Sequence, residues 1–188
     1  MKRIDALRVI DATYSDRPIV VTCGATAREL ASIGARDTHL YLLDSMGAAA
    51  AVGLGLALAG RGPLATIEGD GSLLMGCSIL PSITYLDPRG FVLVALNNHV
   101  HASADFLPTQ AERVSLAAMC RGAGITTLEA ADDNDLKDRL DEARGASQRE
   151  PVAVVVTIEP DNAPGIPLLL DDPVSIKDRF TKAMEALS

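Results

Sequence analysis

The sequence predicts a doubly wound α/β domain with about six parallel strands and helices on both faces of the sheet. Apolar runs rich in Val, Ile and Leu alternate along the chain with longer stretches of helical character. These runs are continuously apolar, which is typical of parallel strands whose two faces are both covered by helices. Strand–helix alternation over this length indicates the α/β class.

The expected elements follow one another without a linker or repeat that would mark a second domain. A helix opens the chain, and strands and helices then alternate. The helices are expected at residues 4–13, 26–34, 45–60, 73–86, 110–124 and 133–146, and the strands at 18–22, 38–43, 63–68, 90–96, 125–130 and 151–158. We therefore expect one domain over residues 1–188, with a proline-containing tail from about residue 160 that ends in an amphipathic helix.

Composition limits the partners and the compartment. Lys and Arg total 17 against 25 Asp and Glu, and the resulting net charge of −8 argues against general nucleic-acid binding. The three cysteines are far apart, which favours reduced thiols and a cytoplasmic location over a disulfide framework or a zinc site. The N-terminus lacks a signal-peptide pattern, and the apolar segment 45–60 is shorter than the ~20 residues that span a bilayer, so we expect no membrane association.

Four segments with the composition of ligand-binding loops are expected at one edge of the sheet. In an open parallel sheet, ligands bind at the carboxyl ends of strands, where loops meet helix N-termini. The segments follow four of the expected strands and lie at residues 22–26, 42–47, 68–72 and 97–106.

The segment 68–72, EGDGS, combines features of a phosphate site with those of a metal site. Its glycines let backbone N–H groups approach a phosphate, and the helix expected from Leu73 directs its positive end there. Asp70 would repel that phosphate unless a divalent cation such as Mg²⁺ lay between them. Asn97 and Asn98, after the next strand, supply amide carbonyls. Singly, the two motifs also fit a turn and a helix cap, but their pairing across one helix favours a Mg²⁺–diphosphate site.

The pairing of GDGS with NN resembles the thiamine-diphosphate motif of thiamine-dependent decarboxylases. The segments DSMGAAAAVGLGLAL, EGDGSLLMG and LNNHVHASADFLPT are more specifically similar to the diphosphate-binding domain of sulfopyruvate and phosphonopyruvate decarboxylases. The resemblance extends from about Ile19 to about Ile125. It implies a thiamine-diphosphate-binding fold of the PP type, thiamine diphosphate and Mg²⁺ as cofactors, and decarboxylation of a 2-oxo acid as the reaction.

The resemblance also assigns the metal and diphosphate ligands. It implies that Asp70, Asn98 and the carbonyl of Val100 bind Mg²⁺, with Asn97 as an alternative to Asn98. It further implies that Gly71 and Ser72 hold the diphosphate oxygens, with help from Gly24 and Ala25. The complete cofactor-binding set is Gly24, Ala25, Asp44, Ser45, Met46, Gly69, Asp70, Gly71, Ser72, Asn98, Val100 and His101.

Two residues of this set are candidates for a catalytic role. Met46 matches the bulky residue that lies beneath the cofactor and holds it in its bent, reactive shape; without the resemblance, core packing would be the simpler interpretation. His101 is a candidate proton donor or ligand for the anionic end of the substrate. His99, a second loop histidine, is less favoured than His101.

The resemblance further implies a partner. In this family the glutamate that activates the cofactor comes from a pyrimidine-binding domain, and this sequence encodes no such domain. We therefore expect the chain to be the β subunit of a hetero-oligomer, inactive without a pyrimidine-binding α subunit, that decarboxylates a small anionic 2-oxo acid.

The sequence departs from the family pattern at two loops. ASADFLPT, residues 102–109, replaces the family's glycine-rich DSTGGQ, which should alter the substrate pocket and leaves the identity of the 2-oxo acid open. Asp44 stands where the family has a glycine whose carbonyl holds the pyrimidine amino group, so its side chain needs room.

Three alternative functions remain open from the sequence. A carboligase subunit would use the same cofactor loops, and a non-catalytic subunit would keep only the fold. A dinucleotide-binding domain is suggested by GLGLALAG, residues 53–60, although these glycines are expected inside a helix and not at the turn where a phosphate contact requires them.

Overall fold

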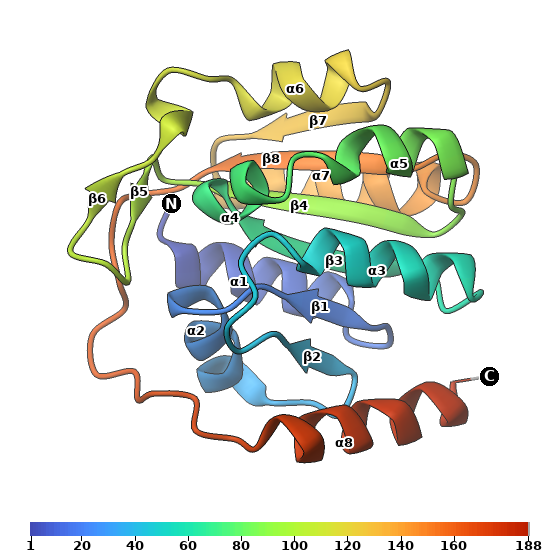
Figure 1. Cartoon of the computed structure of the whole chain (residues 1–188), viewed down its shortest axis with the longest axis horizontal. Coiled ribbons are helices and arrows are strands. Elements are labelled where there is room, and N and C mark those ends of the chain that lie inside the picture. Colours follow the sequence, from blue (N-terminus) through green and yellow to red (C-terminus); the bar gives the residue numbers. More distant parts are fainter. Residues whose placement is uncertain (188) are drawn as a thin grey trace.

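The computed structural model describes residues 1–187 and confirms the predicted architecture, a sheet of six parallel strands between two layers of helices (Figure 1). The order of the strands across the sheet is β2-β1-β3-β4-β8-β7. Their bounds are β1 (Ile19–Val21), β2 (His39–Tyr41), β3 (Leu64–Gly69), β4 (Phe91–Asn97), β7 (Thr126–Ala130) and β8 (Val152–Thr157).

Two apolar clusters hold the helices to the two faces of this sheet. The helices are α1 (Arg3–Thr13), α2 (Ala25–Gly34), α3 (Ala49–Leu58), α4 (Asp70–Met75), α5 (Ile79–Leu86), α6 (Leu116–Gly122), α7 (Asp133–Ala146) and α8 (Pro173–Ala186). One cluster joins α1, α2 and α7 to the strands, and the other joins α3, α5 and α6. The helix α8 ends the tail and packs beside the edge strand β2 (Figure 1). Among residues 1–187, no helix has both the length and the apolar character needed to cross a bilayer.

The direction of the chain across the sheet reverses between β1 and β3. From β1 the chain moves outward to β2, then returns to pair β3 on the other side of β1 and continues to β4. In open α/β sheets such a switch point leaves a crevice at the carboxyl ends of the strands, where ligands bind. The segments that follow β1 and β3 are two of those expected to form the site.

Helix boundaries differ from the prediction at three places. The helix expected at 73–86 is two helices, and α4 already begins at Asp70, so Asp70 and Ser72 lie in a helical first turn instead of a preceding loop. The helix expected at 45–60 begins only at Ala49. The helix expected at 110–124 is a 3₁₀ turn, η1 (Gln110–Glu112), followed by α6, whose N-cap Ser115 accepts a hydrogen bond from the backbone of the first turn.

A short hairpin that the sequence did not predict forms within the loop after β4. Its strands are β5 (Val100–His101) and β6 (Leu107–Pro108), which pair antiparallel. The hairpin lies beyond the carboxyl ends of the strands, at the left in Figure 1, and its strand β5 contacts α4. It carries most of the segment that departs from the family pattern.

The helix α3 lies unusually close to β3 because of Gly53. A β-carbon at this position would lie 1.8 Å from Cγ2 of Thr66. Thr66 is fully buried, and its hydroxyl donates a 3.0 Å hydrogen bond to the carbonyl of Val92, so its side chain cannot turn away without losing that bond. The helical glycine therefore serves close packing, in agreement with its expected place inside a helix.

Replacing Gly53 with alanine should destabilise the protein. We expect Gly53→Ala to lower the free energy of unfolding by about 1–3 kcal/mol, because the added methyl group overpacks the contact with Thr66. Gly55→Ala is the matched control, since nothing lies within 4 Å of a β-carbon there; it should be neutral or stabilising by about 0.4–1 kcal/mol. Urea denaturation of the two variants checks this, and equal stabilities would contradict the packing argument.

Candidate functional site

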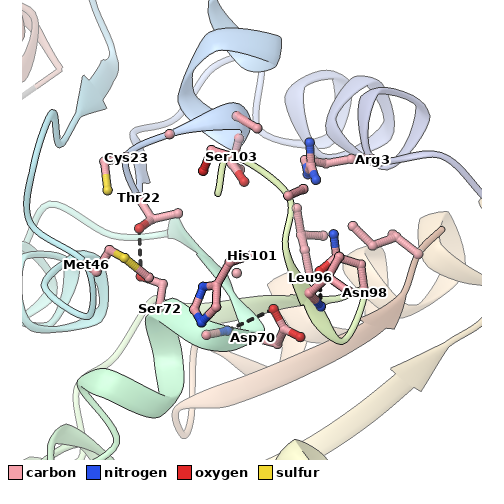
Figure 2. A pocket seen from close by; sticks show the side chains of 18 residues that line it. Arg3, Thr22, Cys23, Met46, Asp70, Ser72, Leu96, Asn98, His101 and Ser103 are labelled. Atoms are coloured by element: carbon pink, nitrogen blue, oxygen red, sulfur yellow. Dashed lines mark hydrogen bonds between the residues drawn. The ribbon is translucent and has the colours of Figure 1, made fainter. Parts of the chain in front are cut away.

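A cavity lies at the carboxyl ends of the strands, where all four predicted segments meet. The cavity is open to solvent, and its empty space, including the open mouth, is about 520 Å³. Its wall includes residues from each segment (Figure 2). The contributions follow β1, β2, β3 and β4 in turn: residues 22–26, Met46, residues 69–72, and Asn98 with residues 100–103. Arg3, Leu96 and Ile158 complete the lining.

Asp70 is a buried carboxylate with no cationic partner among the described residues 1–187. Asp70 is only 2% exposed. One carboxylate oxygen accepts a 2.8 Å hydrogen bond from the Gly71 amide and the other accepts one of 2.8 Å from the Thr109 hydroxyl. Among residues 1–187, no Lys, Arg or His side chain forms an ion pair with it. A carboxylate offers about four acceptor positions, so Asp70 retains capacity for a cation from outside the protein.

The two asparagines at the end of β4 face opposite sides of the structure. Asn98 lines the cavity together with Asp70, whereas Asn97 lines a separate pocket beside Val155. The side-chain carbonyl of Asn98 accepts a 3.2 Å hydrogen bond from the Val100 amide, which fixes it at the start of the hairpin. Of the two alternatives, Asn98 is the one that the fold places near Asp70. His99 turns away with Asn97 and contacts the Ala111 carbonyl through Nδ1, at 3.0 Å.

Gly71 and His101 are in close contact across the cavity. A β-carbon at Gly71 would lie 2.3 Å from Cε1 of His101 and 2.8 Å from its Nδ1. A larger residue at position 71 would therefore require the imidazole to move from its place above the first turn of α4. In Figure 2 the ring of His101 lies between Ser72 and Asp70. The predicted candidate His101 thus lies directly at the GDGS turn.

The N-terminus of α2 contributes unpaired amide groups to the same cavity. Gly24 adopts φ 77° at the N-cap position, and no side chain caps the helix. The first N–H groups of a helix have no intrahelical acceptor, so they attract anions. The predicted pair Gly24 and Ala25 is therefore well placed to hold phosphate oxygens.

Met46 lies on a loop that two glycines hold against the end of α4. Gly47 has φ 79°, and a β-carbon there would lie 2.6 Å from the backbone nitrogen of Gly76. This close approach of the two backbones explains why the helix expected at 73–86 is interrupted near Gly76. Met46 lines the cavity and is still 40% exposed, so its apolar side chain forms an open wall opposite the hairpin.

Glu68 is a site residue that sequence reasoning missed. It is fully buried, and its carboxylate accepts hydrogen bonds from the Ala50 amide (3.0 Å) and from the Ser72 hydroxyl. Ser72 Oγ also accepts one of 2.8 Å from the Gly47 amide and shares one of 2.7 Å with Thr22. Burial raises the pKa of the Glu68 carboxyl, while the hydrogen bonds oppose that shift. One carboxylate thus connects β3 to the start of α3, to α4 and to the Met46 loop.

The hydroxyl of Ser72 is consequently committed to the protein interior. The predicted contact between Ser72 and a diphosphate would have to come from its backbone. Glu68 is the first residue of the EGDGS motif, but no neighbouring residue in the sequence indicates that its side chain points toward α3.

Two predicted residues lie outside the cavity. Asp44 is exposed and lines a neighbouring pocket that also contains Arg28 and Leu168. Ser45 is exposed and does not line the cavity. The other ten members of the predicted cofactor-binding set all line it: Gly24, Ala25, Met46, Gly69, Asp70, Gly71, Ser72, Asn98, Val100 and His101.

The residues of the cavity fit a magnesium–diphosphate ligand. Residues 1–187 contain no group of three or more His, Cys, Asp or Glu side chains that could hold a metal ion alone. A single carboxylate, an amide and backbone carbonyls suit Mg²⁺, which commonly completes its octahedron with water and phosphate oxygens. The uncompensated charge of Asp70 and the uncapped start of α2 match the two parts of such a ligand.

Comparison with known proteins confirms the resemblance seen in the sequence. The model of the thiamine pyrophosphate enzymes' C-terminal TPP-binding domain matches residues 22–156. The chain therefore belongs to this family of thiamine-pyrophosphate-binding domains.

Individual relatives add detail to this assignment. The chain is 31% identical over 182 residues to the sulfopyruvate decarboxylase subunit beta of Methanothermobacter thermautotrophicus, a match that covers 97% of this chain and 95% of that one. It is 33% identical over 180 residues to the phosphonopyruvate decarboxylase of Streptomyces viridochromogenes, covering 95% of this chain but 45% of that protein. These homologues are decarboxylases.

The fold also matches solved structures of more distant enzymes. Benzoylformate decarboxylase from Polynucleobacter necessarius superposes with a TM-score of 0.69 at 18% identity, over 85% of this chain and 33% of that one. At this level of identity the likeness concerns the fold, and it supports the predicted thiamine-diphosphate-binding architecture.

Removing the Ser72 hydroxyl should destabilise the fold. We expect Ser72→Ala to lower the free energy of unfolding by about 1–3 kcal/mol, because buried groups of Glu68 and Gly47 lose their partner. Ser78→Ala is the matched control, since Ser78 is exposed and its side chain makes no capping bond; its effect should stay within about 0.5 kcal/mol. Thermal and urea denaturation measure both, and an unaffected Ser72→Ala variant would contradict the role of the network.

Proposed function

We propose that this chain is the β subunit of a thiamine-diphosphate- and Mg²⁺-dependent decarboxylase that acts on a small anionic 2-oxo acid. It binds the diphosphate, while a partner subunit supplies the pyrimidine site and the activating glutamate. The observation that carries this proposal is Asp70, the first residue of α4. It is a buried carboxylate without a cationic partner in the part of the chain that the structure describes, and it lines the same cavity as the N-terminus of α2. Family membership over residues 22–156 supports the same cofactor.

The cavity residues take distinct roles in this proposal. Asp70, the Asn98 side chain and the Val100 carbonyl would hold Mg²⁺, and the backbone at Gly24, Ala25 and Ser72 would hold the diphosphate. The predicted contact from Gly71 would require its amide to be shared with Asp70, to which it already donates. When bound, thiamine diphosphate supplies the carbon nucleophile and the electron sink that decarboxylation requires.

Two side chains then shape the reacting end of the site. Met46 supports the cofactor from one side with an apolar surface that excludes water. His101 lies over the same turn of α4, where its imidazole is available to bind the anionic end of the substrate or to donate a proton.

The substrate class is proposed from two relatives. Their names specify sulfopyruvate and phosphonopyruvate, which are small 2-oxo acids with a second anionic group. The altered segment at residues 102–109 forms the hairpin beside the cavity, so the choice among such acids is expected to depend on it.

The surface of α3 supports a partner subunit. All ten residues of this helix are apolar, yet the face formed by Ala51, Gly55 and Leu58 is exposed. A helix that is apolar on every side is normally covered on every side. Met46, which lines the cavity, and Met75 are also exposed, at 40% and 64%. These exposed apolar side chains give the partner that is proposed to complete the site a further surface to cover.

Loss of the Asp70 carboxylate should abolish cofactor binding. We expect Asp70→Asn to raise the dissociation constant of thiamine diphosphate in the presence of Mg²⁺ on the order of 100-fold, because it removes the charged metal ligand. Isothermal titration of the chain with its copurified partner measures this, and Asp87→Asn, at an exposed turn, is the control. Chelation of Mg²⁺ should have a similar effect. Unchanged binding by the Asp70 variant would overturn the proposed function.

A charge on the exposed face of α3 should prevent assembly. We expect Gly55→Glu to abolish copurification with the partner and CO₂ release from 2-oxo acids, while the isolated chain stays folded, because a buried carboxylate would lie in the interface. Gly122→Glu is the matched control, since it also adds a carboxylate at an exposed helical glycine with nothing within 4 Å of a β-carbon. Decarboxylation by the chain alone, without a partner, would refute the two-subunit proposal.

A further inference from the structure

A buried arginine from the far end of the sequence reaches the cavity. Arg3 is the first residue of α1 and is only 4% exposed, yet it lines the same cavity as Asp70 and Asn98. In Figure 2 it lies at the upper right, above Leu96 and Asn98, on the side of the cavity away from Met46. None of the motif segments contains this residue.

Most of the hydrogen-bonding capacity of Arg3 is unused. Its Nη1 donates to Glu29 Oε1 at 2.8 Å and to Asn162 Oδ1 at 3.1 Å. Nε and Nη2 carry three more N–H groups, and none of them has an acceptor among residues 1–187. Neither Nε nor Nη2 is a fully buried atom without a partner, so both retain some accessible surface. Because the residue is almost fully covered and lines the cavity, these donors are open toward the cavity.

Three separate parts of the chain hold Arg3 in place. Glu29, on α2, is 2% exposed and accepts both the Arg3 bond and a 3.1 Å bond from the Ala163 amide. Asn162, in the tail, accepts from Arg3 and donates a 2.7 Å bond to the Ala102 carbonyl in the hairpin loop. The guanidinium is therefore fixed in position before any ligand arrives, and the same contacts connect the tail to the hairpin.

The charge of the proposed ligand explains what such an arginine would bind. A diphosphate carries more negative charge than one Mg²⁺ neutralises, and Asp70 adds a further negative charge to the site. Arginine donates to phosphate oxygens through paired, charge-assisted hydrogen bonds, and a fixed guanidinium loses little freedom on binding. On the opposite side, Met46 offers only apolar surface.

We propose that Arg3 binds the diphosphate of the cofactor through its free Nε and Nη2 donors, with Glu29 and Asn162 as positioning residues. This inference rests on the proposed function, because it concerns the same ligand. The substrate's anionic group is the other possible oxyanion, but the place of Arg3 opposite Met46 favours the diphosphate.

The test compares variants that distinguish the effect of the Arg3–Glu29 ion pair on the fold from the proposed contact between Arg3 and the diphosphate. Arg3→Met/Glu29→Met removes both partners and leaves no unpaired buried charge. Arg3→Lys keeps a cation, and Glu29→Gln keeps an acceptor for Arg3. Thiamine diphosphate and, separately, inorganic pyrophosphate are titrated with Mg²⁺ into the full chain with its copurified partner, and thermal unfolding monitors the fold.

The double variant should bind both probes about 10- to 100-fold more weakly, because charged hydrogen bonds to the diphosphate are lost. Arg3→Lys should fall between it and the wild type, and Glu29→Gln should retain most of the wild-type affinity. If the Arg3–Glu29 pair served only to stabilise the fold, Glu29→Gln would weaken binding as much as the double variant does. That result would overturn the proposal.

Two further outcomes would overturn it without affecting the proposed function. In the first, the double variant binds both probes like the wild type while Asp70→Asn does not. In the second, its KM for the 2-oxo acid rises while its affinity for thiamine diphosphate is unchanged, which would assign Arg3 to the substrate. If the wild-type complex failed to bind thiamine diphosphate at all, the proposed function itself would fail.

Discussion

Two buried carboxylates at the end of β3 determine how the site is built. Glu68 receives its hydrogen bonds from within the chain, from the start of α3 and from Ser72, and so joins the sheet to the loops around the cavity. Asp70, two residues later, receives hydrogen bonds but no positive charge from residues 1–187. Since a buried charge is costly unless it is paired, the fold satisfies the first carboxylate internally, whereas the second keeps acceptor capacity for the proposed Mg²⁺.

Two close contacts at glycines hold the elements around the cavity together and leave one apolar face of α3 exposed. Gly53 lets α3 approach β3, and Gly47 lets the Met46 loop approach the turn after α4. These contacts use one face of α3 for the core and leave its other apolar face, at Ala51, Gly55 and Leu58, exposed. The same packing therefore produces a fixed cofactor cavity and a surface suited to a partner, which is consistent with a site completed by a second subunit.

Much of the fold and of the candidate site could be predicted because both are encoded locally. Continuous apolar runs defined the six strands, and the GDGS and NN segments defined the loops at their ends. The errors arose where a long-range contact overrode a local pattern. The apolar run 73–86 looks like one helix, but the contact of Gly76 with Gly47 interrupts it. Arg3 and Glu68 were missed because their roles depend on neighbours distant in sequence.

The sequence by itself determined the fold class and the residue types that meet at the sheet edge, because periodicity and turn chemistry act over a few residues. Only the tertiary structure decided which of two adjacent asparagines faces the cavity, since neighbouring residues at the end of a strand point to opposite sides and the pairing of β4 fixes which side is which. It also decided that Arg3 joins the site. The packing of α1 beside α2 brings the guanidinium of Arg3 to Glu29 and to the cavity. No local sequence pattern at the N-terminus predicts that contact.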